Sequence, residues 1–260
     1  MNRTPLFLLA FHQDERLSAD TFWLPDGFDV QTVEPALTPG GKLQRLRAVS
    51  KALGDAMQVE RTTGSTHAVV SGDCLFSLPI LAALQRAGLE PALVWFDAHG
   101  DLHTLESSTS GYLGGMSLRM ALGADPEVLT ASLGLRPLRE DQVALVGARD
   151  LDPAEVAYLA TSRIRRPRVE DVNGELQAPA PLFVHVDVDV IDGDEVPGLS
   201  FPSSNGPSAT TVFGAVRRLR DTGRVIALHI SCPWRPPASL ADAHARGRLL
   251  AGLLEGLLQG

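Results

Sequence analysis

The sequence contains few cysteines, no long apolar run and no excess of positive charge. Two cysteines among 260 residues do not suggest a disulfide scaffold, so a reducing cytoplasm is the expected location. No stretch approaches the roughly 20 consecutive apolar residues of a membrane-spanning helix. The formal net charge of −8 disfavours non-specific binding to nucleic acid or to an anionic membrane surface. We therefore expect neither nucleic acid nor a membrane as a partner.

The remaining composition is that of a folded domain. Hydrophobic residues make up 44% of the chain, which supports a full core and argues against disorder. The first ten residues are basic and then apolar, but the apolar run is short and no small-residue cleavage site follows it. We expect a first strand there and not a signal peptide. No segment resembles an interdomain linker, so we expect a single domain over residues 1–260.

Apolar segments alternate with amphipathic segments along the chain. We expect strands over residues 6–10, 30–33, 68–70, 92–96, 143–146, 182–187 and 225–229, with a weaker candidate at 164–169. We expect helices over residues 42–59, 78–87, 115–122, 153–160, 209–221 and 240–258. Strands that are separated by helices pair in parallel and are covered on both faces, so the predicted fold class is α/β.

Two strand-like stretches end in groups that bind metals. Asp97, His99 and Asp101 follow the first stretch at spacings of two residues, and Asp187 and Asp189 lie at the end of the second. Side chains at positions i and i+2 of a strand share a face, so the second pair points the same way. Ligands collect at the carboxyl ends of strands in open α/β sheets. We therefore expect four carboxylates and one imidazole to meet at one edge of the sheet.

Four converging carboxylates would repel one another and raise one another's pKa. Neither stretch contains Lys or Arg, so cations are the expected source of positive charge. Two divalent cations would supply about +4 against about −4, and two metals can share a hydroxide and polarise a substrate. Mostly oxygen ligands with one imidazole suit Mn²⁺ better than a structural zinc. Considered singly, each aspartate could also be an ordinary turn or helix cap.

The order and spacing of these motifs resemble those of the ureohydrolase superfamily, which holds arginase, agmatinase, guanidinobutyrase and formiminoglutamase. The similar segments are Gly-Asp-Cys at 72–74, Phe-Asp-Ala-His-Gly-Asp at 96–101, Ser-Gly-Tyr-Leu-Gly-Gly-Met at 110–116 and Val-Asp-Val-Asp-Val-Ile-Asp at 186–192. Residues 147–153 resemble a further family segment. The resemblance covers nearly the whole chain.

The resemblance implies a three-layer αβα sandwich around a mostly parallel, roughly eight-stranded sheet, and commonly a homo-oligomer, a trimer or hexamer. It implies two Mn²⁺ ions that activate water for attack on a guanidinium-like group of a small-molecule substrate, which yields urea and an amine. Carried over residue by residue, Asp97 and Asp187 would bridge the two metals. Asp101 would bind one metal, and His99 and Asp189 would bind the other.

Cys74 departs from the family pattern, because it stands where the family usually has a histidine ligand. Cys74 is either the sixth metal ligand or a small buried thiol without a metal bond. As a ligand, the thiolate would add one negative charge and make the bound water a weaker acid. A soft sulfur would also move the metal preference from Mn²⁺ toward Zn, Fe or Co.

Gly114 is the second departure, because it lies where arginases have a histidine thought to shuttle protons. Glycine has no group for acid–base catalysis. His103, two residues after Asp101, is the nearest possible substitute, although it could equally be an exposed loop residue. We therefore expect Asp101 and His103 to be the catalytic residues.

The third departure concerns the substrate. Cys232 and His229 occupy positions where the family has acidic residues, one of them against the substrate guanidinium. A guanidinium favours a carboxylate fork, so arginine and agmatine become less secure candidate substrates. Ser108, Ser110 and Tyr112 match loop positions that contact the substrate tail in arginase. We expect these five residues to bind substrate.

The sequence thus predicts a dinuclear manganese-dependent hydrolase that cleaves a C–N bond of a linear amidine, which is a guanidino or formimino compound. One alternative is a catalytically degenerate relative that keeps the fold and acts as a binding or assembly subunit. The three departures favour that reading. A second alternative is a metal-dependent amide hydrolase on the related deacetylase-like scaffold, which the missing guanidinium carboxylate favours.

Overall fold

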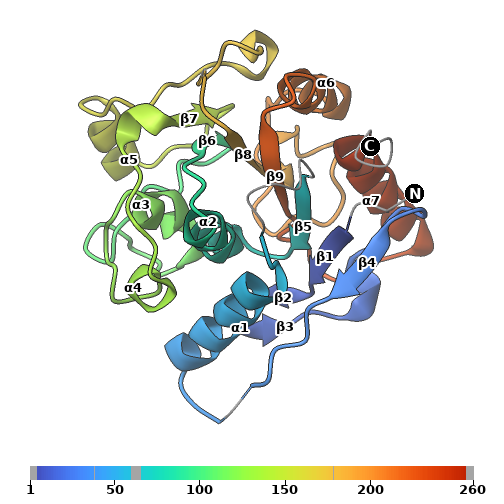
Figure 1. The fold of residues 1–260 in the computed structure, drawn as a ribbon. Helices are drawn as coiled ribbons and strands as arrows, with labels where there is room; N and C mark the ends of the chain where they lie inside the picture. Colours follow the sequence, from blue (N-terminus) through green and yellow to red (C-terminus); the bar gives the residue numbers. More distant parts are fainter. Residues whose placement is uncertain (1–4, 38, 60–65, 178, 256–260) are drawn as a thin grey trace.

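A parallel sheet with helices on both faces forms the centre of the protein, as seen in a computed structural model that describes residues 5–37, 39–59, 66–177 and 179–255 (Figure 1). In spatial order the strands are β4 (Asp29–Thr32), β1 (Pro5–Leu9), β5 (His67–Ser71), β9 (Val225–Ser231), β8 (Leu182–Asp187), β6 (Ala92–Phe96) and β7 (Val143–Val146). All pairings in this sheet are parallel. A separate antiparallel pair joins β2 (Phe11–His12) to β3 (Glu15–Arg16).

The helices form a layer on each face of the sheet. One face is covered by α6 (Ala209–Arg220) and α7 (Leu240–Leu254). The other face carries α1 (Lys42–Ala56), α2 (Ser77–Arg86), α3 (Ser117–Ala121), α4 (Thr130–Leu133) and α5 (Pro153–Leu159). Short 3₁₀ turns are η1 (Ala19–Thr21), η2 (Cys74–Phe76), η3 (Gly114–Met116), η4 (Glu140–Gln142), η5 (Val169–Asp171) and η6 (Val188–Val190).

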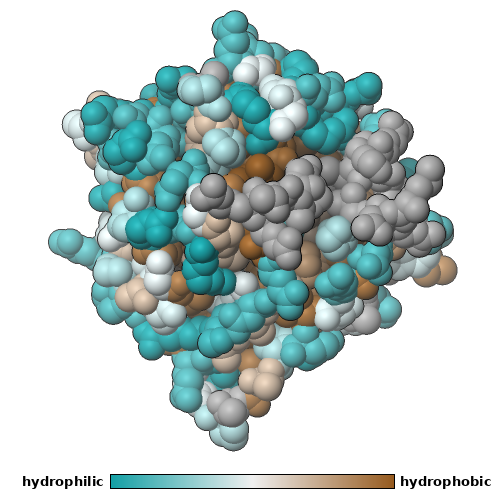
Figure 2. All heavy atoms as spheres, viewed as in Figure 1, coloured by the Kyte–Doolittle hydropathy of each residue, from teal (hydrophilic) through white to brown (hydrophobic). Residues whose placement is uncertain are grey.

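Two apolar cores, one on each face, hold these layers together. In β6, Leu93 and Trp95 pack on the side of α1 to α5, whereas Val94 and Phe96 pack on the side of α6 and α7. This alternation follows from the two-residue period of a strand. A parallel sheet that is buried on both faces needs apolar residues at both sets of positions, which explains the nearly continuous apolar runs of the sequence. Hydrophilic residues predominate on the face shown in Figure 2, with hydrophobic residues scattered between them.

The predicted α/β class and the three-layer arrangement are confirmed. Each of the seven predicted strands is present within two residues of its expected bounds. The sheet has seven strands in the described part of the chain, where the resemblance implies roughly eight. The weaker candidate at 164–169 forms only an isolated bridge from Arg165 to Ala144. Pro167 lies in the middle of this segment and has no N–H to continue a ladder.

The helix predictions were less accurate at their ends than the strand predictions. The segment at 115–122 begins as the 3₁₀ turn η3 and becomes α3 at Ser117. α1 ends at Ala56, and α7 ends at Leu254, while residues 256–258 of the predicted last helix lie outside the described residues. The short helix α4 was not predicted. Among the helices that the structure describes, none is both long and apolar enough to span a membrane.

Candidate functional site

The predicted metal ligands lie at the carboxyl edge of three strands in the middle of the sheet, β5, β8 and β6. These strands are parallel, so the residues that follow them emerge at the same edge. A cavity of about 190 Å³ opens over this edge. Its lining includes the predicted site residues Cys74, Asp97, His99, Asp101, His103, Ser108, Ser110, Tyr112, Asp187 and Asp189.

Asp97, His99 and Asp189 form one set of potential metal ligands, which we call the outer group. Each offers an atom within 4.8 Å of those of the others. His99 Nδ1 lies 3.0 Å from Asp189 Oδ2 and 3.4 Å from Asp97 Oδ1. The backbone after β6 orients both carboxylates, because the N–H of His99 donates to Asp97 at 2.7 Å and the N–H of Ala98 donates to Asp189 at 3.1 Å.

Asp187 and Cys74 lie directly beside each other. The thiol of Cys74 donates to Asp187 Oδ2 at 2.8 Å, and the hydroxyl of Ser231 donates to the same oxygen at 3.1 Å. The other oxygen of Asp187 accepts from the N–H of Asp189 at 3.0 Å. Cys74 therefore lies beside an acid that was predicted to bind a metal, and its own role as a ligand stays a prediction. Both Cys74 and Cys232 are buried and free.

Asp101 is held in a left-handed backbone conformation, with a φ of 51°. Its carbonyl accepts from the N–H of Arg119 at 2.9 Å, and Glu155 fixes the next residue by accepting from the N–H of Leu102 at 3.0 Å. Asp101 Oδ2 is buried and has no hydrogen-bond partner among the described residues. A buried carboxylate oxygen without a partner lowers the stability of the fold. A bound cation would supply the missing partner of Asp101 Oδ2.

The acids of the site perturb one another. Burial raises the pKa of Asp101 well above its ordinary value, and the charges of Asp97 and Asp187 raise it further. Burial and the charge of Asp97 raise the pKa of Asp189 to about 7, despite the opposing hydrogen bond from His99. Burial disfavours the charged form of His99, but its hydrogen bonds to Asp189 and Asp97 prevail and raise its pKa to about 12. No Lys or Arg lines the described cavity, so this donor set fits divalent cations.

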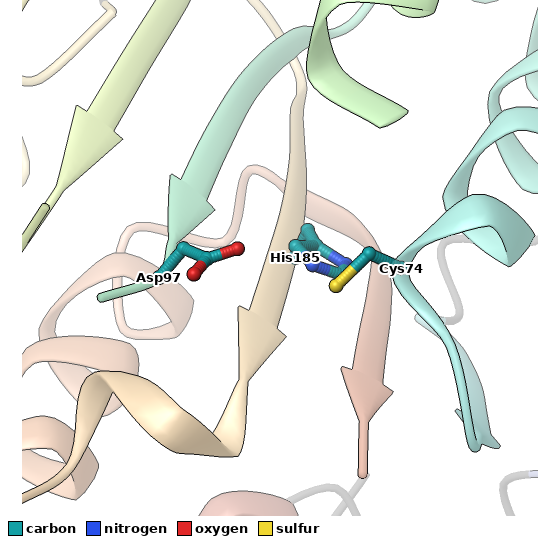
Figure 3. Close-up of side chains that lie close together, drawn as sticks. All are labelled: Cys74, Asp97 and His185. Carbon is teal, nitrogen blue, oxygen red and sulfur yellow. The ribbon is translucent and has the colours of Figure 1, made fainter. Parts of the chain in front are cut away.

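Cys74, Asp97 and His185 form a second set of potential ligands, which we call the inner group (Figure 3). Each again offers an atom within 4.8 Å of those of the others. His185 is fully buried in β8, two residues before Asp187, and therefore lies on the same face. His185 was not predicted as a ligand from the sequence. The spacing of two residues from Asp187 was the signal that could have identified it.

His103 lies at the cavity wall and has partners at both ring nitrogens. Nε2 lies 2.9 Å from Asp152 Oδ2, and Nδ1 lies 3.2 Å from the hydroxyl of Ser107. Asp152 is the N-cap of α5 and is itself fixed by a capping box with Glu155. The loop after β6 and the start of α5 therefore position this ring. Its predicted catalytic role stays a prediction.

Ser108 and Ser110 lie in the loop that forms the outer wall of the cavity. Their hydroxyls accept from nearby backbone N–H groups, Ser108 from Gly111 at 3.1 Å and Ser110 from Tyr112 at 3.2 Å. Gly111 adopts a φ of 67°, which favours glycine. These bonds hold a tight turn at the cavity, so both hydroxyls are near the position where a substrate would bind.

Tyr112 fills the space beside Gly114. A Cβ atom added at Gly114 would lie 2.4–2.6 Å from atoms of the Tyr112 side chain, so no side chain fits there while this ring is in place. The hydroxyl of Tyr112 donates to Asp73 Oδ2 at 3.2 Å. The ring stacks on His12 with centroids 5.8 Å apart and lies 5.0 Å from the ring of Phe201. The lack of a side chain at position 114 is thus coupled to the presence of Tyr112.

His229 and Cys232, which were predicted to bind substrate, do not line the described cavity. Both are fully buried. His229 Nδ1 lies 2.9 Å from Nδ1 of His185, and His229 Nε2 lies 2.8 Å from the hydroxyl of Ser71. Burial lowers the pKa of His229 to about 3. Because both side chains are buried outside the cavity lining, their placement does not support contact with substrate.

Comparison with known proteins gives consistent matches. The Arginase family model matches residues 13–232. The arginase of Bacillus subtilis (strain 168) is 27% identical over 228 residues, which cover 82% of this chain and 77% of that protein. An N(omega)-hydroxy-L-arginine amidinohydrolase of Streptomyces lavendulae is 32% identical over 158 residues, 59% of this chain and 55% of that protein. The crystal structure of the B. subtilis arginase is similar with a TM-score of 0.80 at 21% identity, over 98% of this chain and 99% of that chain.

Proposed function

The chain belongs to the arginase family of C–N bond hydrolases, and on this premise we propose that it is a metal-dependent hydrolase of a linear amidine, a guanidino or formimino compound. The observation that carries the proposal is the cluster of buried acids with His99 at the base of the cavity. We propose further that the protein is cytoplasmic and forms a homo-oligomer, a trimer or hexamer.

The residues that would hold the cations are the outer group together with Asp101 and Asp187. We propose two divalent cations, with Mn²⁺ as the family choice. When bound, they would supply the positive charge that polarises the substrate and acidifies water. Asp101 Oδ2, which has no hydrogen-bond partner in the described part of the chain, and the mutually raised pKa values of the acids support this assignment.

His103 is the group of this chain that we propose for proton transfer. The carboxylate of Asp152 accepts only, so it orients the His103 ring with the proton on Nε2. Nδ1 then has a free electron pair, which accepts from the hydroxyl of Ser107 in the resting protein. His103 can take a proton at Nδ1, and Asp152 stabilises the imidazolium that forms.

The walls of the cavity support a small cationic substrate. Asp150 lies in its lining with an exposed side chain, and its carboxylate is available to an amidinium group in place of the acid that is missing at position 232. Tyr112 and Phe201 provide an apolar wall. We propose that Ser108 and the other hydroxyl groups of its loop contact the substrate tail.

The test is reconstitution followed by an activity screen. The protein is stripped with a chelator, loaded separately with Mn²⁺ and Zn²⁺, and assayed for release of urea, formamide and ammonia from guanidino and formimino compounds. Turnover that requires metal supports the proposal. Stoichiometric metal without turnover of any compound indicates a non-catalytic relative, and acetate release from acetylated amines indicates an amide hydrolase. Sedimentation analysis of the same sample gives the number of subunits.

A further inference from the structure

The inner group forms a layer directly beneath the acidic edge. His185 pairs in register with Trp95 of β6 on one side and with His229 of β9 on the other. Its side chain shares a face with that of Asp187, two residues closer to the edge. The rings of His185 and Trp95 lie 3.7 Å apart between centroids, and both residues are fully buried. The position of the His185 ring is therefore fixed by the sheet.

A chain of hydrogen bonds behind His185 sets its tautomer. We assign the protons of this chain from the hydroxyl of Ser71, which donates its single proton to the carbonyl of Asp73 at 3.2 Å and accepts from His229 Nε2 at 2.8 Å. With its proton on Nε2, His229 has a free electron pair on Nδ1 and accepts there from His185 Nδ1 at 2.9 Å. His185 then has a bare electron pair on Nε2. This nitrogen is buried and has no partner within the described parts of the chain.

The donors of the inner group converge from three strands. Figure 3 shows Asp97 at the end of β6, His185 in β8 and Cys74 after β5, with their side chains turned toward one another. Trp95 Nε1 donates to Asp97 Oδ2 at 3.0 Å, so the same indole that packs on His185 also orients the carboxylate. A thiolate, a carboxylate and a neutral imidazole together balance the charge of one divalent cation. Such a set suits Zn²⁺.

We propose that His185 Nε2 is a ligand of one of the two proposed cations, the one that Cys74 and Asp97 hold, and that this inner group selects Zn²⁺ over Mn²⁺ at that position. Thiolate and imidazole favour zinc, whereas carboxylate and water favour manganese. A histidine that binds a metal through one ring nitrogen usually donates a hydrogen bond from the other, which fixes its tautomer and raises its basicity. The hydrogen bond from His185 to His229 is of this kind. The inference goes beyond the proposed function because it identifies a cation and its ligands, whatever the substrate is.

X-ray absorption at the zinc edge tests the ligand set directly in the full chain. The sample is a His99→Gln variant loaded with one equivalent of Zn²⁺, so that the outer group offers no imidazole. We expect the spectrum to show both a sulfur atom and an imidazole ring among the ligands of the zinc. Sulfur without imidazole, or no sulfur, would overturn the proposal. This measurement does not depend on hydrolytic activity, so it is separate from any failure of the proposed function.

A binding competition gives the second readout. Loss of a hydrogen-bond partner of a metal ligand costs roughly 10–100-fold in metal affinity. In His185→Gln the zinc affinity should fall by more than this, while the manganese affinity changes less. His67→Gln is the matched control, because His67 is also buried but begins β5 at the opposite end of the sheet. Equal zinc affinity in folded His185→Gln and His67→Gln would contradict the proposal. If His185→Gln does not fold, the absorption experiment decides.

Discussion

The two sides of the cavity are built in different ways. The strand side, which comprises Cys74, Asp97, Asp187 and Asp189 with His185 beneath them, is buried, and its side chains are placed by strand register and by hydrogen bonds to the backbone. The loop side comprises His103, Ser108, Ser110 and Tyr112. It is half-buried or exposed and is held by turns and a helix cap.

This difference indicates which chemistry each side controls. We expect the strand side to determine which cation binds and where, because its donors cannot move without disrupting the sheet. We expect the loop side to determine which substrate fits, because its side chains can change without loss of the fold. Two of the three departures from the family pattern belong to one of these sides each. Cys74 lies on the strand side, and Gly114 lies beside Tyr112 on the loop side. Cys232 does not line the described cavity and belongs to neither side.

Replacing Asp97 should have the largest effect, because Asp97 belongs to both the outer and the inner group. In Asp97→Ala we expect loss of bound metal and a fall in kcat/KM of about 10³-fold or more. A catalytic cation contributes several kcal/mol to transition-state stabilisation, and about 1.4 kcal/mol corresponds to a factor of ten in rate. Metal analysis and steady-state kinetics measure both quantities.

Asp171→Ala provides the control for Asp97→Ala. Asp171 is exposed and forms a surface ion pair with Arg168, so metal content and activity should remain at wild-type levels. If Asp97→Ala kept its full metal content, the strand side could not be the part of the cavity that fixes the metal.

Cys74→His should have the next largest effect. It distinguishes the inner group, which contains Cys74, from the outer group, which does not. The substitution restores the family residue and removes the thiol that donates to Asp187. We expect the ratio of zinc to manganese affinity to fall by at least about tenfold, since a borderline-soft metal loses its soft ligand. Competition with a chelator of known affinity measures this ratio. An unchanged ratio would show that Cys74 is a structural thiol.

Most of the strand side could be predicted from the sequence. The spacing of Asp97, His99 and Asp101 after an apolar run, and of Asp187 and Asp189 at the end of another, placed these residues at one edge because parallel strands share a direction. Cys74 was placed by resemblance. His185 was not predicted, because a histidine in an apolar strand is usually a hydrogen-bonded core residue. Only strand register shows that its neighbours are Trp95 and His229.

The loop side was harder to predict, because its contacts join segments that are distant in sequence. Tyr112 was expected to contact the substrate tail, but nothing local shows that its ring occupies the space beside Gly114 and reaches Asp73. The bond from His103 to Asp152 depends on how the loop after β6 meets the start of α5. His229 and Cys232 were assigned by matching positions, which gives no information about the direction of a side chain.

Gly114→Ala tests the packing of the loop side. The new Cβ would meet the Tyr112 side chain at 2.4 Å, so the ring must move. We expect the free energy of unfolding to fall by about 1–3 kcal/mol, as in other overpacked sites. Gly115→Ala is the matched control, because the nearest Tyr112 atom lies 4.0 Å away in ordinary contact.

The double variant Gly114→Ala with Tyr112→Ala should be more stable than the sum of the single changes predicts, since removal of the ring relieves the clash. A coupling of about 0.5–3 kcal/mol is the usual range for residues in contact. Chemical denaturation of the four proteins in the cycle gives this coupling. If the two changes were additive, Tyr112 would not occupy the space of a residue 114 side chain.

The smallest expected effect is the dependence of stability on pH in the metal-free protein, which reports the charge of the strand side. The pKa of Asp189 is raised to about 7, so the folded state holds its proton more tightly than the unfolded chain. This contribution is fully present below the ordinary aspartate pKa of about 4 and is lost as the pH rises through about 7. The raised pKa of His99 acts in the same direction at higher pH. We expect the Tm of metal-free protein to fall by a few degrees between about pH 5 and 8.

Asp189→Asn isolates this contribution from the rest of the chain. The amide cannot titrate, so the decrease in Tm between about pH 4 and 7 should be smaller in this variant than in the wild type. Loading the wild type with metal should reverse the trend, because cations bind the deprotonated ligands and stabilise the folded state more as the pH rises. A metal-free Tm with the same pH dependence in both proteins would show that Asp189 is already charged without a cation. Asp189 would then not need a metal to neutralise it, and one electrostatic difference between the two sides of the cavity would disappear.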